Sequence, residues 1–235
     1  MDAVEIIHSV PLGVTCNRPP LVVKLHGPIS RETYDTCVQQ FKSLRQRSSL
    51  NVIVFSIDCL GGDVVWAFKI GALMDANRHA YGTCIIGIGY QVHSAAGYLY
   101  AKCDLRFMHP DAGSVLIHDV SIAFGRDTVQ NLTTKLNRIQ SDAHKIFRTI
   151  SRACGKDDSF IENLLHNTYE LRWTTVDAHR HGFVHHMGIP KLEHTIKQSF
   201  NIDGILFGDY IKRVSHFQTA ERPVGEQRTL EQIMS

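Results

Sequence analysis

A chain of 235 residues, 43% hydrophobic and 20% charged, has the composition of a soluble globular protein of about one domain. Its formal net charge of +2 points neither to nucleic acid nor to an anionic membrane as a partner. No apolar stretch approaches the roughly 18 residues that a membrane-spanning helix needs, and the N-terminus lacks the basic start of a secretory signal.

Six cysteines are scattered along the chain, and none of them forms a CxxC pair. Several fall in or beside apolar runs, which favours reduced, buried thiols over a disulfide framework or a zinc site. The expected location is therefore a reducing compartment, namely the cytoplasm or an organelle matrix.

Short apolar runs alternate with helical segments through the first half of the chain. A glycine pair, Gly61-Gly62, separates the second strand from the second helix, and Ser94 separates the third strand from the third helix. The pattern predicts strands over 21–26, 51–58, 83–90, 105–109 and 115–118, and helices over 30–47, 64–79 and 94–103.

The strongest helical signal covers residues 127–154, where apolar residues recur at spacings of three and four. Asp127 is the expected cap at its start and Gly155 the expected end. A helix of this length measures about 42 Å. Two interpretations stay open: part of it projects to meet another subunit, or it is a core helix with a frayed end.

The pattern then predicts a helix over 158–167, a strand over 169–173, a capped helical turn over 174–182 and a strand over 183–187. Strands that alternate with helices in this way indicate an α/β fold with a mostly parallel sheet covered by helices. Beyond about residue 190 the sequence is less periodic, and its polar last part is expected to be a mobile tail.

Two turns carry candidate chemistry. Gly61-Gly62 leaves backbone N–H groups uncovered at a helix start, which suits a phosphate or an oxyanion, although an ordinary strand-to-helix turn has the same pattern. Ser94 is either an N-cap or a nucleophile. With a nucleophile at 94, the N–H groups of Gly62 and Ala95 form an oxyanion hole. His118, at the end of an apolar strand, is the candidate base, or else a structural histidine.

The order of these motifs over residues 20–190 resembles the proteolytic subunit of the Clp protease (ClpP) family. Its oxyanion glycines match Gly61-Gly62, its nucleophile segment matches Ser94-Ala95-Ala96-Gly97, and its Ile-His strand end matches Ile117-His118. Its last helix and strand match TTVDAHRHGFVHHM. The resemblance implies a ClpP/crotonase-like spiral of β-β-α units in which 127–154 is a long projecting handle helix.

The chain departs from the family at the third member of the catalytic triad. The family has an aspartate where this sequence has Glu170, and glutamate serves as the orienting acid in some hydrolases of another fold. The resemblance thus implies a Ser94–His118–Glu170 triad. Asp119 is the alternative acid, ranked lower because neighbouring residues of a strand point to opposite faces. Leu60 replaces a usual proline, and Ala95-Ala96 replaces a usual Met-Gly.

The resemblance further implies a serine endopeptidase that cleaves unfolded polypeptides and needs no metal or cofactor. Its subunits form a homo-oligomeric ring, a heptamer or a double heptamer, fed by an AAA+ unfoldase ATPase. The chain then divides into a short N-terminal segment (1–19), the peptidase domain (20–190) and a C-terminal extension (191–235). Two other interpretations stay open: a catalytically silent ring subunit, and a crotonase-fold hydratase or isomerase acting on an acyl-CoA.

Overall fold

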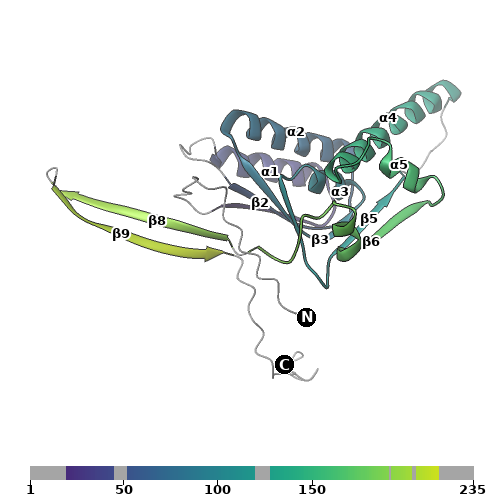
Figure 1. Cartoon of the computed structure of the whole chain (residues 1–235). Coiled ribbons are helices and arrows are strands. Elements are labelled where there is room, and N and C mark those ends of the chain that lie inside the picture. The colour runs from purple at the N-terminus through teal and green to yellow at the C-terminus, as the bar shows by residue number, and fades with distance from the viewer. Residues whose placement is uncertain (1–19, 45–51, 120–127, 191, 203–204, 217–235) are drawn as a thin grey trace, which may run out of the picture.

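The computed structural model describes residues 20–44, 52–119, 128–190, 192–202 and 205–216. A seven-stranded sheet forms the body, and helices pack on it (Figure 1). The strands are β1 (Leu21–His26), β2 (Val52–Cys59), β3 (Cys84–His93), β4 (Leu105–Met108), β5 (Ser114–His118), β6 (Glu170–Thr174), β7 (His186–Met187), β8 (Leu192–Ile202) and β9 (Ile205–His216). The helices are α1 (Arg31–Leu44), α2 (Val64–Tyr81), α3 (Ala95–Ala101), α4 (Val129–Ala153), α5 (Phe160–Leu165) and α6 (Thr175–Arg180).

The sheet is parallel except at one edge, as the alternation of strands and helices predicts. Strands β1, β2, β3, β4 and β7 lie side by side, while β5 pairs with β3 in parallel and with β6 antiparallel. The first part of β3 pairs with β4, and its last three residues, 91–93, pair with β5 instead. The sheet therefore forks at the end of β3, directly before Ser94.

The main core lies between the sheet and the helices. Val23, Ile53 and Phe55 come from the sheet, and Ile70 and Leu99 come from α2 and α3; all are almost fully buried. A second, smaller cluster fills the opposite face of the central strands. Its members are Val52, Val54, Ile86, Ile88 and Phe107. Because the first four residues of β2 are buried on both faces, they form a continuous apolar run, VIVF, in the sequence.

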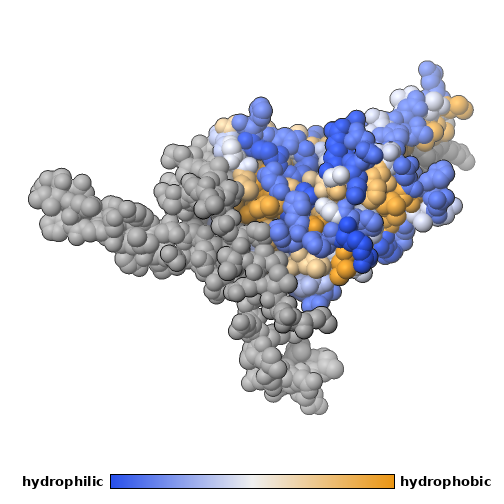
Figure 2. All heavy atoms as spheres, viewed as in Figure 1, coloured by the Kyte–Doolittle hydropathy of each residue, from blue (hydrophilic) through white to orange (hydrophobic). Residues whose placement is uncertain are grey.

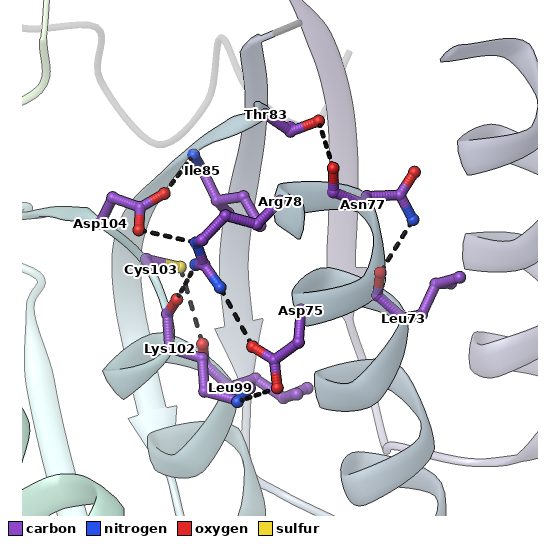
Figure 3. A network of polar contacts seen from close by, with 10 residues as sticks. All are labelled: Leu73, Asp75, Asn77, Arg78, Thr83, Ile85, Leu99, Lys102, Cys103 and Asp104. Atoms are coloured by element: carbon purple, nitrogen blue, oxygen red, sulfur yellow. Dashed lines mark hydrogen bonds and ion pairs between the residues drawn. The ribbon is translucent and has the colours of Figure 1, made fainter. Parts of the chain in front are cut away.

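A polar network anchors the end of α3 to α2 (Figure 3). Arg78 donates from Nε to Asp104 Oδ1 (2.9 Å) and from an Nη to the carbonyl of Lys102 (2.7 Å). Lys102 Nζ in turn lies 2.6 Å from Asp75 Oδ2, and Asp104 accepts a hydrogen bond from the backbone N–H of Ile85. These contacts fix the helix that follows Ser94 against its neighbours.

Arg106 is a buried cation on β4, 5% exposed, that is bonded mainly to main-chain carbonyls. It donates to the carbonyls of Cys103, Ala153 and Phe183, and it lies 2.7 Å from His185 Nε2. Burial, followed by the Arg106 charge, lowers the pKa of His185 to about 4, so that ring is neutral near pH 7. Arg106 thus joins the ends of α3 and α4 to the segment after α6.

Helix α4 has two dissimilar halves. Its C-terminal half packs into the core through Ala143, Ile146, Phe147 and Ile150. Its N-terminal half is mostly exposed, with Val129 at 81% exposure, and Figure 1 shows this end extending past the sheet. The helix therefore both packs into the core and projects, which combines the two interpretations that the sequence leaves open. Its use as a contact between rings stays a prediction.

Several boundaries differ from the sequence predictions. Thr128 caps α4 by accepting a hydrogen bond from the N–H of Asn131, so the expected cap, Asp127, is wrong; that residue lies outside the described ranges. Strand β3 runs on to His93, whereas β7 has only two residues. Beyond residue 190, strands β8 and β9 form an antiparallel hairpin that the sequence analysis did not predict. The expected tail, and residues 1–19, lie outside the described ranges.

Five cysteines fall in the described part of the chain, and all are free thiols. Four of them are buried, and burial raises the pKa of Cys37 and of Cys103 to about 12. Within the described ranges, none of the helices combines the length and the apolar character that crossing a bilayer requires.

Candidate active site

Ser94 occupies a strained turn between β3 and α3. Its backbone angles are φ 55° and ψ −126°, and among the described residues it is the only non-glycine with a positive φ. Ser94 occupies the N-cap position of α3, as one of the two interpretations expects, but its side chain makes no capping hydrogen bond. Its N–H donates instead to the carbonyl of Leu116 on β5 (2.7 Å). A serine held in strain at a strand-to-helix turn is typical of a nucleophile.

The glycine pair lies against this serine. A Cβ on Gly61 would come within 2.7 Å of the Ser94 Cβ, and one on Gly62 within 2.5 Å of both the N and the O of Ile29. Both glycines also have a positive φ, 103° and 146°. Only glycine fits at either position, because any side chain would collide with backbone or with Ser94 and would strain the turn.

The hydrogen bonds around Gly62 leave its own N–H facing away from Ile29. Ile29 donates to the carbonyl of Gly61 (2.8 Å) and accepts from the N–H of Asp63 (3.0 Å), so both bonds flank Gly62. Ala95 is the first residue of α3, where an N–H has no intrahelical partner. Within the described ranges, neither the Gly62 nor the Ala95 N–H is used by a hydrogen bond, and both residues line one cavity.

The residues on either side of the glycine pair hold the turn. The N–H of Gly61 lies 3.3 Å from Cys59 Sγ, and burial raises the pKa of that thiol, which keeps it neutral. Asp63 caps α2 by accepting a hydrogen bond from the N–H of Val65 (2.7 Å). The aspartate of the GGD motif is therefore a helix cap, which the spacing of the motif could have predicted.

A cavity of about 140 Å³ opens beside Ser94. Two of its walls, Ile146 and Phe147, come from the buried half of α4, some fifty positions along the chain from the serine. The cavity is mostly apolar, and its polar edge is formed by Ser94 and His118. Its lining residues are Gly62, Val64, Ser94, Ala95, Ile117, His118, Ile146 and Phe147.

His118 is the last residue of β5 and is half-buried at the edge of this cavity. Its Nδ1 lies 2.5 Å from the main-chain carbonyl of Asp119. Because a carbonyl only accepts, Nδ1 carries the proton, and the neutral ring keeps its lone pair on Nε2. That is the tautomer that a general base needs. Strand β5 ends at His118, and Asp119 lies beyond it as an exposed residue. The alternation of side chains along a strand therefore does not decide whether Asp119 can be the orienting acid.

Glu170 lies directly opposite His118 in the antiparallel pairing of β5 with β6. Side chains of such a pair share one face of the sheet, with Cβ atoms about 5 Å apart. The carboxylate is half-exposed, and its Oε1 accepts a hydrogen bond from Nε of Arg172 (2.6 Å). Within the described ranges, no hydrogen bond joins Ser94 to His118 or His118 to Glu170. The three residues of the expected triad are thus neighbours whose hydrogen bonds go elsewhere.

A second histidine, His93, stands next to the serine. Its Nε2 lies 2.9 Å from Ser114 Oγ, across the β3–β5 pairing. Burial, and then the charge of Arg172, lower the pKa of His93, which favours a neutral ring. His93 therefore adds no positive charge beside Ser94.

A larger groove of about 720 Å³ lies beside this cavity, along α4, α5 and the start of β6. Phe147 lines both, so the groove and the cavity share a wall. Leu136 is 47% exposed on one side of the groove and Tyr169 is 96% exposed on the other. Figure 2 shows hydrophobic atoms gathered beside α4 and α5, in one of several hydrophobic areas on this face.

Four residues that contribute to this site were not predicted from the sequence in the roles that they have here. Ile146 and Phe147 could have been found only in part, because periodicity shows that α4 has an apolar face but not what that face covers. The contact between Glu170 and Arg172 could have been predicted from the sequence, because residues two apart on a strand share one face of the sheet. The carbonyl of Asp119 has no signal in the sequence.

These features define the class of protein: an α/β protein with a mostly parallel, helix-covered sheet and a strained serine turn against a glycine pair. A family model described as Clp protease matches residues 20–190. The chain belongs to this family, and it is accordingly a peptidase, a hydrolase of peptide bonds. A search of curated proteins found no match. Members of the family generally form oligomeric rings that work with ATPases.

Proposed function

We propose that this chain is a serine endopeptidase subunit of a self-compartmentalised, Clp-type protease that cleaves unfolded polypeptides. The observation that carries the proposal is the strained turn at Ser94, which lies against Gly61 and opens into the cavity that His118 also lines. A serine that only capped a helix would itself have extended backbone angles and a capping hydrogen bond, and would need neither strain nor a cavity.

In the proposed mechanism, Ser94 Oγ attacks the carbonyl carbon of the scissile peptide while His118 Nε2 takes the hydroxyl proton. The tetrahedral intermediate collapses as His118 returns that proton to the leaving amine, which breaks the C–N bond and leaves an acyl-serine. Water, deprotonated by the same imidazole, then attacks the acyl-enzyme and releases the carboxylic acid. The reaction needs no metal or cofactor.

The N–H groups of Gly62 and Ala95 are the proposed oxyanion hole. Both belong to residues that line the cavity, and neither is committed to a hydrogen bond within the described ranges. Donors supplied by the main chain are fixed before the reaction begins, which is why such groups lower the barrier effectively.

Glu170 is the proposed third member of the triad. Its place opposite His118 supports this role, because side chains of such a cross-strand pair share one face of the sheet and lie close together. A carboxylate there would replace the Asp119 carbonyl as acceptor and stabilise the imidazolium that forms during the reaction.

The assembly is proposed from membership of the family. We propose that residues 20–190 form the peptidase domain and that this domain assembles into a homo-oligomeric ring, a heptamer or a double heptamer. The exposed half of α4 is the proposed handle at the contact between rings, and an AAA+ unfoldase ATPase would deliver the polypeptide. The proposed location is the cytoplasm or an organelle matrix, in keeping with the free thiols.

A fluorophosphonate probe, which phosphonylates activated serines, tests the proposal. We expect the native protein to be labelled at Ser94, with labelling abolished in Ser94→Ala and unchanged in Ser159→Ala, an exposed serine at the start of α5. Native mass spectrometry of the same sample reports the ring. A well-formed ring without labelling would instead support the silent subunit, and binding of an acyl-CoA without labelling would support the crotonase-type enzyme.

A further inference from the structure

One face of the β3–β5–β6 edge carries a row of mostly polar side chains, interrupted by Leu116, that reaches from the serine turn to the proposed acid. Residues 114, 116 and 118 of β5 pair with 174, 172 and 170 of β6, while the intervening Val115, Ile117 and Trp173 are buried on the other face. His93 pairs with Leu116 on the opposite side of β5. Arg172 therefore lies in the same row as His93 and next to the pair of His118 and Glu170.

Arg172 makes its contact to the proposed acid through a single pair of atoms. Its Nε lies 2.6 Å from Glu170 Oε1, and no second bond from the guanidinium to the other carboxylate oxygen is formed. The side chains of Arg172 and Glu170 are 71% and 43% exposed, respectively. One oxygen is thus held along β6, and Oε2 stays available on the face that Glu170 shares with His118.

The guanidinium also acts on the other side of β5. After burial, the charge of Arg172 is the next cause that lowers the pKa of His93, although the two residues lie on strands that do not pair with each other. This effect on His93 agrees with a guanidinium that lies over the row of residues 93, 116 and 172, and that does not point away from β5. Arg172 is therefore close to both sides of the site.

We propose that Arg172 is a positioning residue, which fixes the Glu170 carboxylate so that its free oxygen can engage His118; this rests on the proposed function. A glutamate has one more rotatable bond than the aspartate that the family uses at this position, so its carboxylate reaches further but is less well defined. Anchoring one oxygen to a guanidinium on the same strand face removes much of that freedom. Arg172 acts through Glu170 and touches neither the substrate nor the reacting atoms.

The first test compares Arg172→Gln with Arg180→Gln in the native protein. Arg180 is a matched control, because it forms a 3.0 Å pair with Asp177 and its side chain is 69% exposed. We expect Arg172→Gln to lower kcat about tenfold with KM unchanged, Arg172→Lys to recover part of the loss, and Arg180→Gln to stay within about twofold of the native rate. The melting temperatures should stay similar, because exposed ion pairs contribute little to stability.

The second test is a double-mutant cycle with Glu170→Asp. The shorter side chain of aspartate cannot make the same contact with the Arg172 guanidinium. In the Glu170→Asp background, the fall in kcat caused by Arg172→Gln should therefore shrink to about twofold or less. The proposal is overturned if Arg172→Gln alone keeps kcat within twofold of native, if it increases kcat, or if its effect is undiminished in Glu170→Asp.

A crystallographic comparison tests the positioning role of Arg172 without a measurement of activity. In Ser94→Ala protein we expect one Glu170 conformer, with the carboxylate against Arg172, and in Ser94→Ala/Arg172→Gln protein we expect several. An unchanged single conformer in the second protein would refute the positioning role whatever the enzyme does. Failure of the native protein to react with the fluorophosphonate would instead refute the proposed function, so the two failures are distinguishable.

Discussion

The serine turn and the proposed acid are held by different means. Close packing of main-chain atoms holds the turn at Ser94. Gly61 and Gly62 pack so closely that a Cβ on either would overlap its neighbours. Around Glu170, the structure relies on one ion pair between exposed side chains. The first arrangement is crowded and strained, and the second is open and solvated.

This difference indicates which parts of the site can change during evolution. A turn built from close main-chain contacts accepts almost no substitution, because every atom there has a backbone neighbour. An exposed carboxylate has solvent around it, so exchanges between glutamate and aspartate at position 170 meet fewer steric limits. The predictions below test that contrast, from the largest expected effect to the smallest.

Gly62→Val should nearly abolish activity. The new Cβ would lie 2.5 Å from the main-chain N and O of Ile29, so the turn must move and its N–H must leave the cavity. Loss of one oxyanion donor costs about 3 kcal/mol, roughly a hundredfold in kcat. Gly155→Ala is the control: its φ is also positive, at 66°, but nothing lies within 4 Å of the new Cβ. Peptidase rates and circular dichroism measure both; a Gly62→Val protein with native rates would contradict the proposed oxyanion hole.

Glu170→Gln should have an intermediate effect, because the amide keeps the shape of the side chain but cannot stabilise an imidazolium by charge. We expect kcat to fall roughly ten- to a hundredfold, less than for a buried triad acid, since water screens this carboxylate. Glu170→Asp should retain more activity than Glu170→Gln.

Asp119→Asn is the matched control for Glu170→Gln, since it keeps the main-chain carbonyl that contacts His118. It should leave kcat within about threefold of native. Peptidase assays on all three variants decide the assignment: if Glu170→Gln is as fast as the native protein and Asp119→Asn is slow, the orienting acid is Asp119.

Ser94→Gly should increase stability while removing the nucleophile. The backbone angles of φ 55° and ψ −126° are costly for serine and easy for glycine, which relieves about 1–3 kcal/mol of strain. The more flexible unfolded chain offsets up to about 1 kcal/mol of that gain. Urea denaturation should therefore show a gain of about 1 kcal/mol over Ser94→Ala, which keeps the Cβ and the strain. Equal stabilities would mean that the turn is not strained.

Much of the fold follows from local patterns in the sequence. The strand-helix alternation predicts the parallel sheet because apolar runs of this length, separated by helical periodicity, pack in few other ways. The end of α4 at Gly155 was predicted correctly, because this glycine has the positive φ that commonly ends a helix. The hairpin of β8 and β9 was not predicted, because the sequence beyond residue 190 is less periodic than the sequence of the sheet and its helices.

The site was less accessible to sequence reasoning. Whether Ser94 caps a helix or is held in strain depends on its φ, and that depends on the distant contacts with Gly61 and Leu116. The residues that wall the cavity lie on α4, and their distance along the chain from the serine hides the contact. The motif order predicts a Ser94–His118–Glu170 triad, which stays a prediction, whereas the hydrogen bonds of His118 and Glu170 depend on side-chain orientations that no motif encodes.

Helix α4 couples two surfaces by its continuity. It runs unbroken for 25 residues, about 37 Å, from the exposed Val129 to the buried residues that wall the cavity at Ile146 and Phe147. A rod without an internal joint transmits a tilt at one end to the other. A change in the tilt of α4 would therefore alter both the cavity beside Ser94 and the position of the exposed end of the helix.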